Sequence, residues 1–178
     1  VGDIALIMAV TDPSKGKKGI SAFAIDKSMP GFYASKKENK LGMRCSDTAS
    51  LTFDNVRVPK SHLIGNPGEG FLQALQILDG GRISIAALSV GTAQAALDAS
   101  LKYANDRVQF NKRILEFQGI QFKLAKMSME IEAARLLTHK AAWMKDQGQN
   151  ITVAASHAKL YASEIAVRAC EESVQIHG

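Results

Sequence analysis

The stretch from Glu69 to Arg107, EGFLQALQILDGGRISIAALSVGTAQAALDASLKYANDR, decides the fold. It is rich in Ala and Leu, and from Phe71 to Leu101 its only charged residues are Asp79, Arg82 and Asp98. At 1.5 Å per residue it predicts one helix of roughly 58 Å, or two helices that break at the adjacent glycines 80 and 81. A helix with so few charges around its circumference is expected to be buried on several sides.

Two further helices are expected downstream, at about 117–147 and 152–177. The first carries an apolar stripe at helical spacing, formed by Ile120, Leu124, Met127, Ile131, Ala134 and Ala141. Gly148 is a natural left-handed stop for it, and Asn150 or Thr152 can cap the next helix. Long helices joined by short loops pack antiparallel, so these segments predict a helix bundle.

The chain before Pro59 has a different composition, with short strand-like runs separated by turns and no helix between them. These runs are expected at residues 3–10, 19–26, 32–37, 49–53 and 55–59. Strands this close together imply an antiparallel sheet. The fold class is therefore α+β, a partial antiparallel β-domain followed by an antiparallel helix bundle.

The expected domain limits are residues 1–60 for the later part of a β-domain, 61–68 for a Gly/Pro-containing linker, and 69–178 for a truncated helical bundle. The chain starts inside a strand-like run without Met and stops at a glycine. We therefore expect it to be part of a longer protein.

The formal net charge of +5 fits an anionic ligand, but a solvated basic surface is the more common explanation of such charge runs. Nucleic acid is disfavoured because the Lys-rich pieces are loop-like and lack interleaved aromatic residues. Cys45 and Cys170 lie far apart, which favours a reducing compartment over a disulfide framework. The four histidines do not cluster, so no metal site is expected, and no apolar run is long enough for a membrane span.

The segment NDRVQFNKR, residues 105–113, brings three basic side chains together with one aromatic ring. Arg107, Lys112 and Arg113 can stabilise the negative end of the preceding helix dipole. Arginine is also the side chain best suited to bidentate contact with a phosphate, so the segment can equally be an anion site.

The segment DGGR, residues 79–82, places two glycines inside a helix, where each costs about 1 kcal/mol relative to alanine. Such a cost is tolerated where something packs closely on the backbone, either a crossing helix or a ligand lying on the glycines. Asp79 and Arg82 share a helical face and can pair with each other.

Four blocks of this sequence, in order, resemble the acyl-CoA dehydrogenases, with the short-chain and short-branched-chain members nearest. The blocks are LGMRCSDTASLTFDNVRVP (41–59), GFLQALQILDGGRISIAALSVG (70–91), DRVQFNKRILEFQGIQFKLAKM (106–127) and SVQIHG (173–178). The resemblance implies a middle β-domain followed by a C-terminal four-helix bundle. It also implies that an N-terminal helical domain and the early β-domain segment around the flavin are not in this chain.

The resemblance assigns FAD as the cofactor and places the basic segment against it. Arg107 and Gln109 match residues that reach the FAD diphosphate of a neighbouring subunit, while Phe110 and Gln118 match positions around the same flavin. The final residues match the start of a Gly-rich turn on the partner's FAD, namely Gln175, Ile176, His177 and Gly178. This favours the anion-site interpretation over the dipole one.

The resemblance implies α,β-dehydrogenation of a short-chain acyl-CoA in fatty acid β-oxidation. A glutamate takes the α-proton, and electrons pass to an electron-transfer flavoprotein. The residues matching the substrate segment are Phe71, Asp79, Gly80, Gly81 and Arg82. The implied assembly is a homotetramer, a dimer of dimers with FAD shared across an interface, in the cytoplasm if bacterial or the mitochondrial matrix if eukaryotic.

No catalytic base is expected within the chain. Some family members carry the glutamate immediately before the arginine of the DGGR segment, where this sequence has Gly81. The other family location lies beyond Gly178. Two alternatives stay open: an acyl-CoA oxidase-like or nitroalkane oxidase-like flavoenzyme that uses O₂, and a non-enzymatic paralogue that binds FAD or acyl-CoA without turnover.

Overall fold

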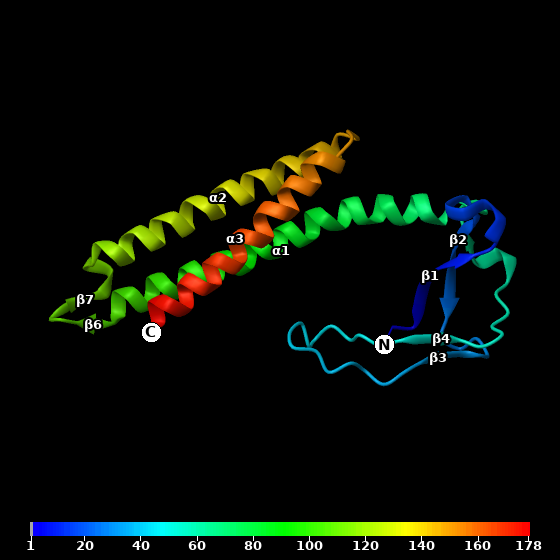
Figure 1. The fold of residues 1–178 in the computed structure, drawn as a ribbon, viewed down its shortest axis with the longest axis horizontal. Coiled ribbons are helices and arrows are strands. Elements are labelled where there is room, and N and C mark those ends of the chain that lie inside the picture. The colour runs from blue at the N-terminus through cyan, green and yellow to red at the C-terminus, as the bar shows by residue number, and fades with distance from the viewer. Residues whose placement is uncertain (1) are drawn as a thin grey trace. The chain divides into compact units, whose positions relative to one another are not determined.

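The computed structural model describes residues 2–178 and divides into two compact units (Figure 1). The first unit ends at Leu75 and contains the strands that precede the first long helix. The second unit, Gln76–Gly178, contains most of the helical residues. The expected α+β class, with small antiparallel sheets followed by a helix bundle, is confirmed. The domain limits expected at residues 60 and 69 stay a prediction.

A three-stranded antiparallel sheet, in the order β1-β2-β5, organises the first unit. Strand β1 (Ile4–Val10) pairs along its whole length with β2 (Ile20–Asp26), and β2 pairs with the short β5 (Leu63–Ile64). The connection between β1 and β2 is the 3-10 segment η1 (Pro13–Gly19). A Cβ at its last residue would lie 1.8 Å from the Asp12 carbonyl oxygen, so this close approach of backbone to backbone requires glycine.

Strands β3 (Phe32–Ala34) and β4 (Leu51–Phe53) form a separate two-stranded sheet, in which Phe32 pairs with Phe53. Their rings stack with centroids 5.1 Å apart. The strand expected at residues 55–59 is wrong, because that segment is irregular. The third strand of the first sheet is instead β5, which follows the 3-10 turn η2 (Lys60–His62) and pairs with Ala22 and Phe23.

The entry into the first long helix is held by local polar contacts. The Asn66 side-chain amide donates to Glu69 Oε1 at 3.1 Å, and the Asn66 backbone amide donates to Glu69 Oε2 at 3.1 Å. These bonds favour the ionised carboxylate and lower the pKa of Glu69 below its usual range. Helix α1 then begins at Gly70, whose backbone lies so close to the Ser21 backbone that an added Cβ would be 2.7 Å away.

Three long helices make up most of the second unit: α1 (Gly70–Asp106), α2 (Gln118–Asp146) and α3 (Thr152–His177). Helix α1 runs without a break through Gly80 and Gly81, so the single-helix alternative is correct. Helix α2 stops where Gly148 adopts a φ of 67°, as the sequence predicts. The N-cap of α3 is Ile151, so neither expected residue occupies that position, although Asn150 Oδ1 accepts a hydrogen bond from the Thr152 amide at the start of the helix.

The core of the helical unit is built mainly from alanines and a few larger side chains. Eight fully or almost fully buried alanines let the helix backbones approach closely: Ala86, Ala93, Ala104, Ala134, Ala141, Ala158, Ala162 and Ala169. Ile131 on α2 and Ile165 on α3 are each 1% exposed and fill the space between them. Figure 1 shows α2 and α3 side by side, and these two helices contact each other along their lengths. The expected apolar stripe on α2 is the face that points into this core.

Replacing Ile165 with alanine is expected to reduce the free energy of unfolding by about 2–5 kcal/mol, because it opens a cavity in a tightly packed interior. Leu160 lies on the same helix but is 57% exposed, so Leu160→Ala is the matched control, with an expected effect of less than about 1 kcal/mol. Urea denaturation of both variants, followed by far-UV circular dichroism, gives the comparison. Equal losses would show that Ile165 does not pack as described.

Candidate cofactor and substrate sites

A two-residue hairpin follows α1 and carries the basic segment. Strands β6 (Val108–Gln109) and β7 (Lys112–Arg113) pair antiparallel, and Phe110 and Asn111 form the turn with φ values of 51° and 63°. Two consecutive positive φ values define the type I′ turn, which matches the natural twist of a hairpin. A phenylalanine is rarely held in this left-handed region, and such strain is concentrated at functional sites.

The Phe110 ring is 86% exposed, and residues 107–113 are exposed throughout. The backbone that carries them is nevertheless fixed, because the Arg107 amide donates to the Tyr103 carbonyl at 2.8 Å and the Ile114 amide donates to the Arg107 carbonyl at 2.9 Å. The hairpin is therefore an ordered element that presents its side chains outward.

The three basic side chains of the hairpin differ in their partners. Arg113 Nη1 donates to Asn105 Oδ1 at 3.0 Å, and its backbone amide donates to Glu116 Oε1 at 3.1 Å, so Arg113 clamps the hairpin to its flanks. Within residues 2–178 the Arg107 guanidinium has no hydrogen bond or ion pair. Of the two arginines, Arg107 is the one available to an external anion.

The end of α3 lies beside the end of α1. The His177 ring stacks on Tyr103 with centroids 4.4 Å apart, and Ser100 donates to Ser173 Oγ at 2.9 Å. Lys123, near the start of α2, pairs with Glu172 on α3. The start of α2, the hairpin and the last turn of α3 thus meet at one end of the helical unit, as Figure 1 also shows.

The predicted cofactor residues are all at this end, but they are not equally accessible. Gln109, Phe110, Gln118, Gln175, His177 and Gly178 are exposed. Ile176 is only 4% exposed because its side chain packs into the helical core, so it is the one predicted cofactor residue that is buried in this part of the chain. His177 is tied by Nδ1 to the Ser173 carbonyl at 2.7 Å.

The DGGR segment lies on α1 beside the junction of α2 and α3. Asp79 pairs with Arg82 through one carboxylate oxygen, and its other oxygen accepts from Thr152 Oγ1 at 2.9 Å. A Cβ at Gly80 would be 3.1 Å from Lys145 Nζ, whereas a Cβ at Gly81 would meet nothing within 4 Å. A Cβ at Gly81 therefore meets open space, whereas one at Gly80 would crowd the Lys145 ammonium.

Phe71, the remaining predicted substrate residue, belongs to the first unit and is half-buried in the first turn of α1. The Lys17 ammonium of η1 lies 5.1 Å from the centroid of its ring. This contact places a basic loop next to the position that the resemblance assigns to the ligand.

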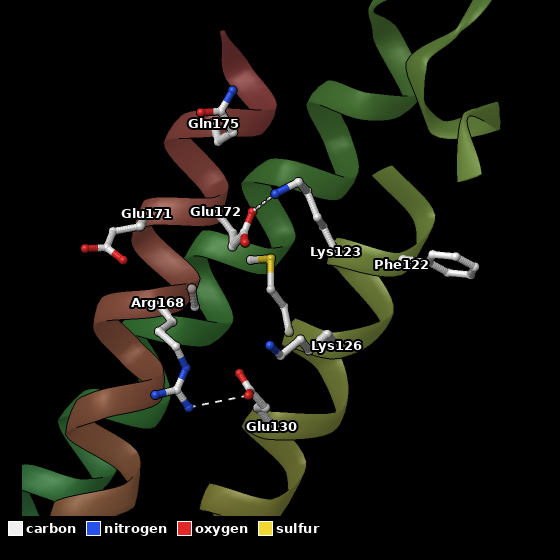
Figure 2. A pocket seen from close by; sticks show the side chains of 10 residues that line it. Phe122, Lys123, Lys126, Glu130, Arg168, Glu171, Glu172 and Gln175 are labelled. Atoms are coloured by element: carbon white, nitrogen blue, oxygen red, sulfur yellow. Dashed lines mark hydrogen bonds and ion pairs between the residues drawn. The ribbon is translucent and has the colours of Figure 1, made fainter. Parts of the chain in front are cut away.

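A groove of about 510 Å³ between α2 and α3 was not predicted from the sequence (Figure 2). Figure 2 shows Lys123 reaching across it to Glu172, and Arg168 reaching Glu130, where the Nη2 to Oε1 distance is 3.4 Å. In the sequence, the only indication of this groove is the spacing of charged residues along each helix. The packing of the two helices is needed to show that opposite charges face each other. These ion pairs connect α2 to α3, so the charged residues that line the groove are explained by helix packing and do not require a ligand.

Neither a metal centre nor a membrane helix is found in residues 2–178. No three His, Cys, Asp or Glu side chains come together as metal ligands. None of the helices in this part of the chain combines the length and hydropathy needed to cross a bilayer.

Comparison with known proteins identifies the family. The family model for the acyl-CoA dehydrogenase C-terminal domain matches residues 68–178. The chain belongs to the acyl-CoA dehydrogenase family. The resemblance in the four blocks is thereby confirmed.

Named relatives of this chain agree with the family match. It is 53% identical to the probable acyl-CoA dehydrogenase YngJ of Bacillus subtilis over 97% of this chain and 46% of the relative. The solved structure of butyryl-CoA dehydrogenase from Megasphaera elsdenii has a TM-score of 0.97 and 48% identity, over 99% of this chain and 46% of that one. The chain thus spans about half the length of the relatives it matches.

A second solved structure also matches this chain. A chain in the structure of the electron transferring flavoprotein of Acidaminococcus fermentans has a TM-score of 0.97 and 46% identity, over 99% of this chain and 47% of that one.

Proposed function

We propose that this chain is part of an FAD-dependent enzyme that dehydrogenates short-chain acyl-CoA thioesters to trans-2-enoyl-CoA. The observation that carries the proposal is the ordered, exposed hairpin beside Arg107, whose guanidinium has no partner among the residues that the structure describes. The guanidinium of an exposed arginine can donate two parallel N–H···O bonds to phosphate oxygens. The diphosphate of a dinucleotide is therefore a suitable ligand for Arg107. The 48% identity to butyryl-CoA dehydrogenase supports the short-chain substrate class.

FAD fits the residues that the hairpin offers. Arg107 and Gln109 would hold the diphosphate of a neighbouring subunit, and the exposed Phe110 ring would lie against the flavin. Gln118 and the last turn of α3, Gln175–Gly178, would contact the same cofactor. When bound, FAD supplies the acceptor for the hydrogen that leaves the β-carbon of the substrate.

The acyl-CoA would lie along α1 over the DGGR segment. Gly81 leaves room for the ligand close to the helix backbone. Asp79 engages both of its carboxylate oxygens, with Arg82 and Thr152, so its role would be to hold the Arg82 guanidinium in place. The chain's own residues would thus bind and orient the substrate.

The α-proton would be removed by a glutamate outside this chain. The α-proton of a thioester is weakly acidic, so the reaction needs hydrogen bonds to the developing oxyanion and a carboxylate in a desolvated site. Gly81, at one family location of this base, has no side chain to accept a proton. The downstream location, beyond Gly178, is the one we propose for the full-length protein.

The surfaces of α2 and α3 support the proposed homotetramer. Each helix carries an exposed apolar side chain at every seventh position: Phe122, Met129, Leu136 and Trp143 on α2, and Val153, Leu160, Val167 and Val174 on α3. Seven residues make almost two helical turns, so each set forms a stripe, and at about 100° per residue it lies roughly opposite the buried face. Exposed apolar stripes of this kind are typical of surfaces covered by another helix.

The isolated chain is therefore expected to self-associate. Size-exclusion chromatography with light scattering should give a mass above that of a monomer, because both stripes are uncovered. The variant Leu136→Glu with Val167→Glu should shift the mass toward the monomer, and Lys140→Glu with Lys159→Glu is the control on exposed polar positions of the same helices. A monodisperse monomer of the unmodified chain would contradict the expectation.

The proposed electron acceptor is an electron-transfer flavoprotein, and the proposed location is the cytoplasm if the source is bacterial or the mitochondrial matrix if it is eukaryotic. Stopped-flow reoxidation of the substrate-reduced full-length protein tests the acceptor. Fast reoxidation by electron-transfer flavoprotein and slow reoxidation by O₂ are expected for a dehydrogenase. Fast reaction with O₂ would indicate an oxidase, and ligand binding without reduction would indicate a non-enzymatic paralogue.

A further inference from the structure

The β6–β7 hairpin also carries Lys112, whose surroundings differ from those of Arg107 and Arg113. The Arg113 side chain donates a hydrogen bond to Asn105, and the Arg113 backbone amide donates one to the Glu116 carboxylate. Lys112 has no hydrogen bond or ion pair in the part of the chain that the structure describes. Its ammonium lies instead 4.3 Å from the centroid of the Phe117 ring.

The hairpin register puts Lys112 on the same face as Gln109. These two residues are directly paired across the strands, whereas Val108 pairs with Arg113. Side chains of directly opposed residues project from the same face of a hairpin, and the next pair projects from the other face. The face that carries Gln109 therefore carries the Lys112 ammonium, and Arg113 projects from the opposite face.

The Phe117 ring holds this arrangement. It meets the Phe110 ring edge to face, with centroids 6.2 Å apart and planes at 89°, while Lys112 lies over it. A cation–π contact orients an ammonium without cancelling its charge, unlike an ion pair with a carboxylate. The nearby carboxylate of Glu116 is engaged by the Arg113 backbone amide. Lys112 thus keeps a free positive charge in a defined position.

We propose that Lys112 is a second cation of the diphosphate-binding site and that Phe117 is the residue that positions it. The inference rests on the proposed function, in which Gln109 reaches the FAD diphosphate. Arg107 would give directional bidentate bonds, and Lys112 would add a point charge on the Gln109 face. The Phe117 ring would hold both the Lys112 ammonium and the Phe110 ring in position.

FAD titration of the full-length apoprotein, followed by quenching of flavin fluorescence, tests this assignment. Lys112→Ala is expected to raise the dissociation constant for FAD by about twofold to fivefold at low salt, the range typical of exposed charge pairs. The difference from the unmodified protein should shrink in about 1 M salt, where the Debye length falls to about 3 Å. Lys159→Ala removes an exposed lysine of α3 and should leave the dissociation constant unchanged.

Phe117→Ala is expected to weaken FAD binding in the same salt-dependent way, and Phe117→Tyr should restore it because the ring is kept. Tyr33→Ala, which removes an exposed aromatic residue of the first unit, is the control. A salt-independent loss for both Lys112→Ala and Phe117→Ala would indicate a merely structural role and overturn the proposal.

The test separates this inference from the proposed function. If Arg107→Ala also leaves FAD binding intact, the hairpin is not a diphosphate site and both fail. If Arg107→Ala weakens binding while Lys112→Ala behaves like Lys159→Ala, only the assignment of Lys112 is overturned.

Discussion

Replacing Arg107 with alanine in the full-length protein is expected to raise the dissociation constant for FAD by about 10- to 150-fold. Hydrogen bonds to charged groups contribute about 1.5–3 kcal/mol, and each 1.4 kcal/mol corresponds to a factor of ten. The guanidinium is exposed and has no partner within residues 2–178, so its removal should not disturb the fold. Fluorescence titration of the apoprotein with FAD measures the effect.

Two further variants make the Arg107 result specific. Arg107→Lys keeps the charge but loses the planar pair of donors, so it should recover only part of the affinity. Lys102→Ala removes a positive charge from the exposed surface of α1 near the same end and should have little effect. If Lys102→Ala loses as much affinity for FAD as Arg107→Ala, only the overall charge matters. That result would contradict a directed contact between Arg107 and the diphosphate.

Gly81→Glu is expected to restore activity in a full-length protein whose downstream glutamate has been replaced by glutamine. Loss of a general base lowers the rate by about 10²- to 10⁴-fold, and a carboxylate at position 81 would stand at the alternative family location. The structure accommodates it, since a Cβ there meets no atom within 4 Å. Replacing a helical glycine also favours the helix by about 0.5–1 kcal/mol.

Steady-state turnover with a short-chain acyl-CoA is measured for Gly81→Glu in two proteins, one with the downstream glutamate and one in which glutamine replaces it. With the downstream glutamate present, Gly81→Glu should give no gain. Gly80→Glu is the matched control, because its side chain projects about 100° away around the helix and toward Lys145. Full activity of a natural protein that has no downstream glutamate would refute the proposed location of the base.

The helical half of the fold could be predicted from sequence because its signals are periodic and local. The α2 stripe, the stop at Gly148 and the Asn150 contact at the start of α3 all follow from spacing and residue type. The strand at 55–59 was wrong because a β-branched run is only a weak signal. Pairing with Ala22 and Phe23 selects Leu63–Ile64 instead, and such long-range pairing is not visible in a local window.

The candidate site could be located from sequence but not resolved into roles. The sequence shows three basic residues in 107–113 without showing which of them is occupied. Only the structure ties Arg113 to Asn105, places Lys112 over Phe117 and leaves the Arg107 guanidinium without a partner among residues 2–178. The left-handed Phe110 was equally hidden, because Phe-Asn is not a standard sequence for a type I′ turn.

The most direct test of the central claim is an anaerobic titration of the purified full-length protein with butyryl-CoA, followed by visible absorbance. The account predicts a flavin absorbance band in the purified protein and its bleaching on addition of substrate, with crotonyl-CoA as the product. A full-length protein that binds no flavin, or whose flavin band is unchanged by any short-chain acyl-CoA, would contradict the account.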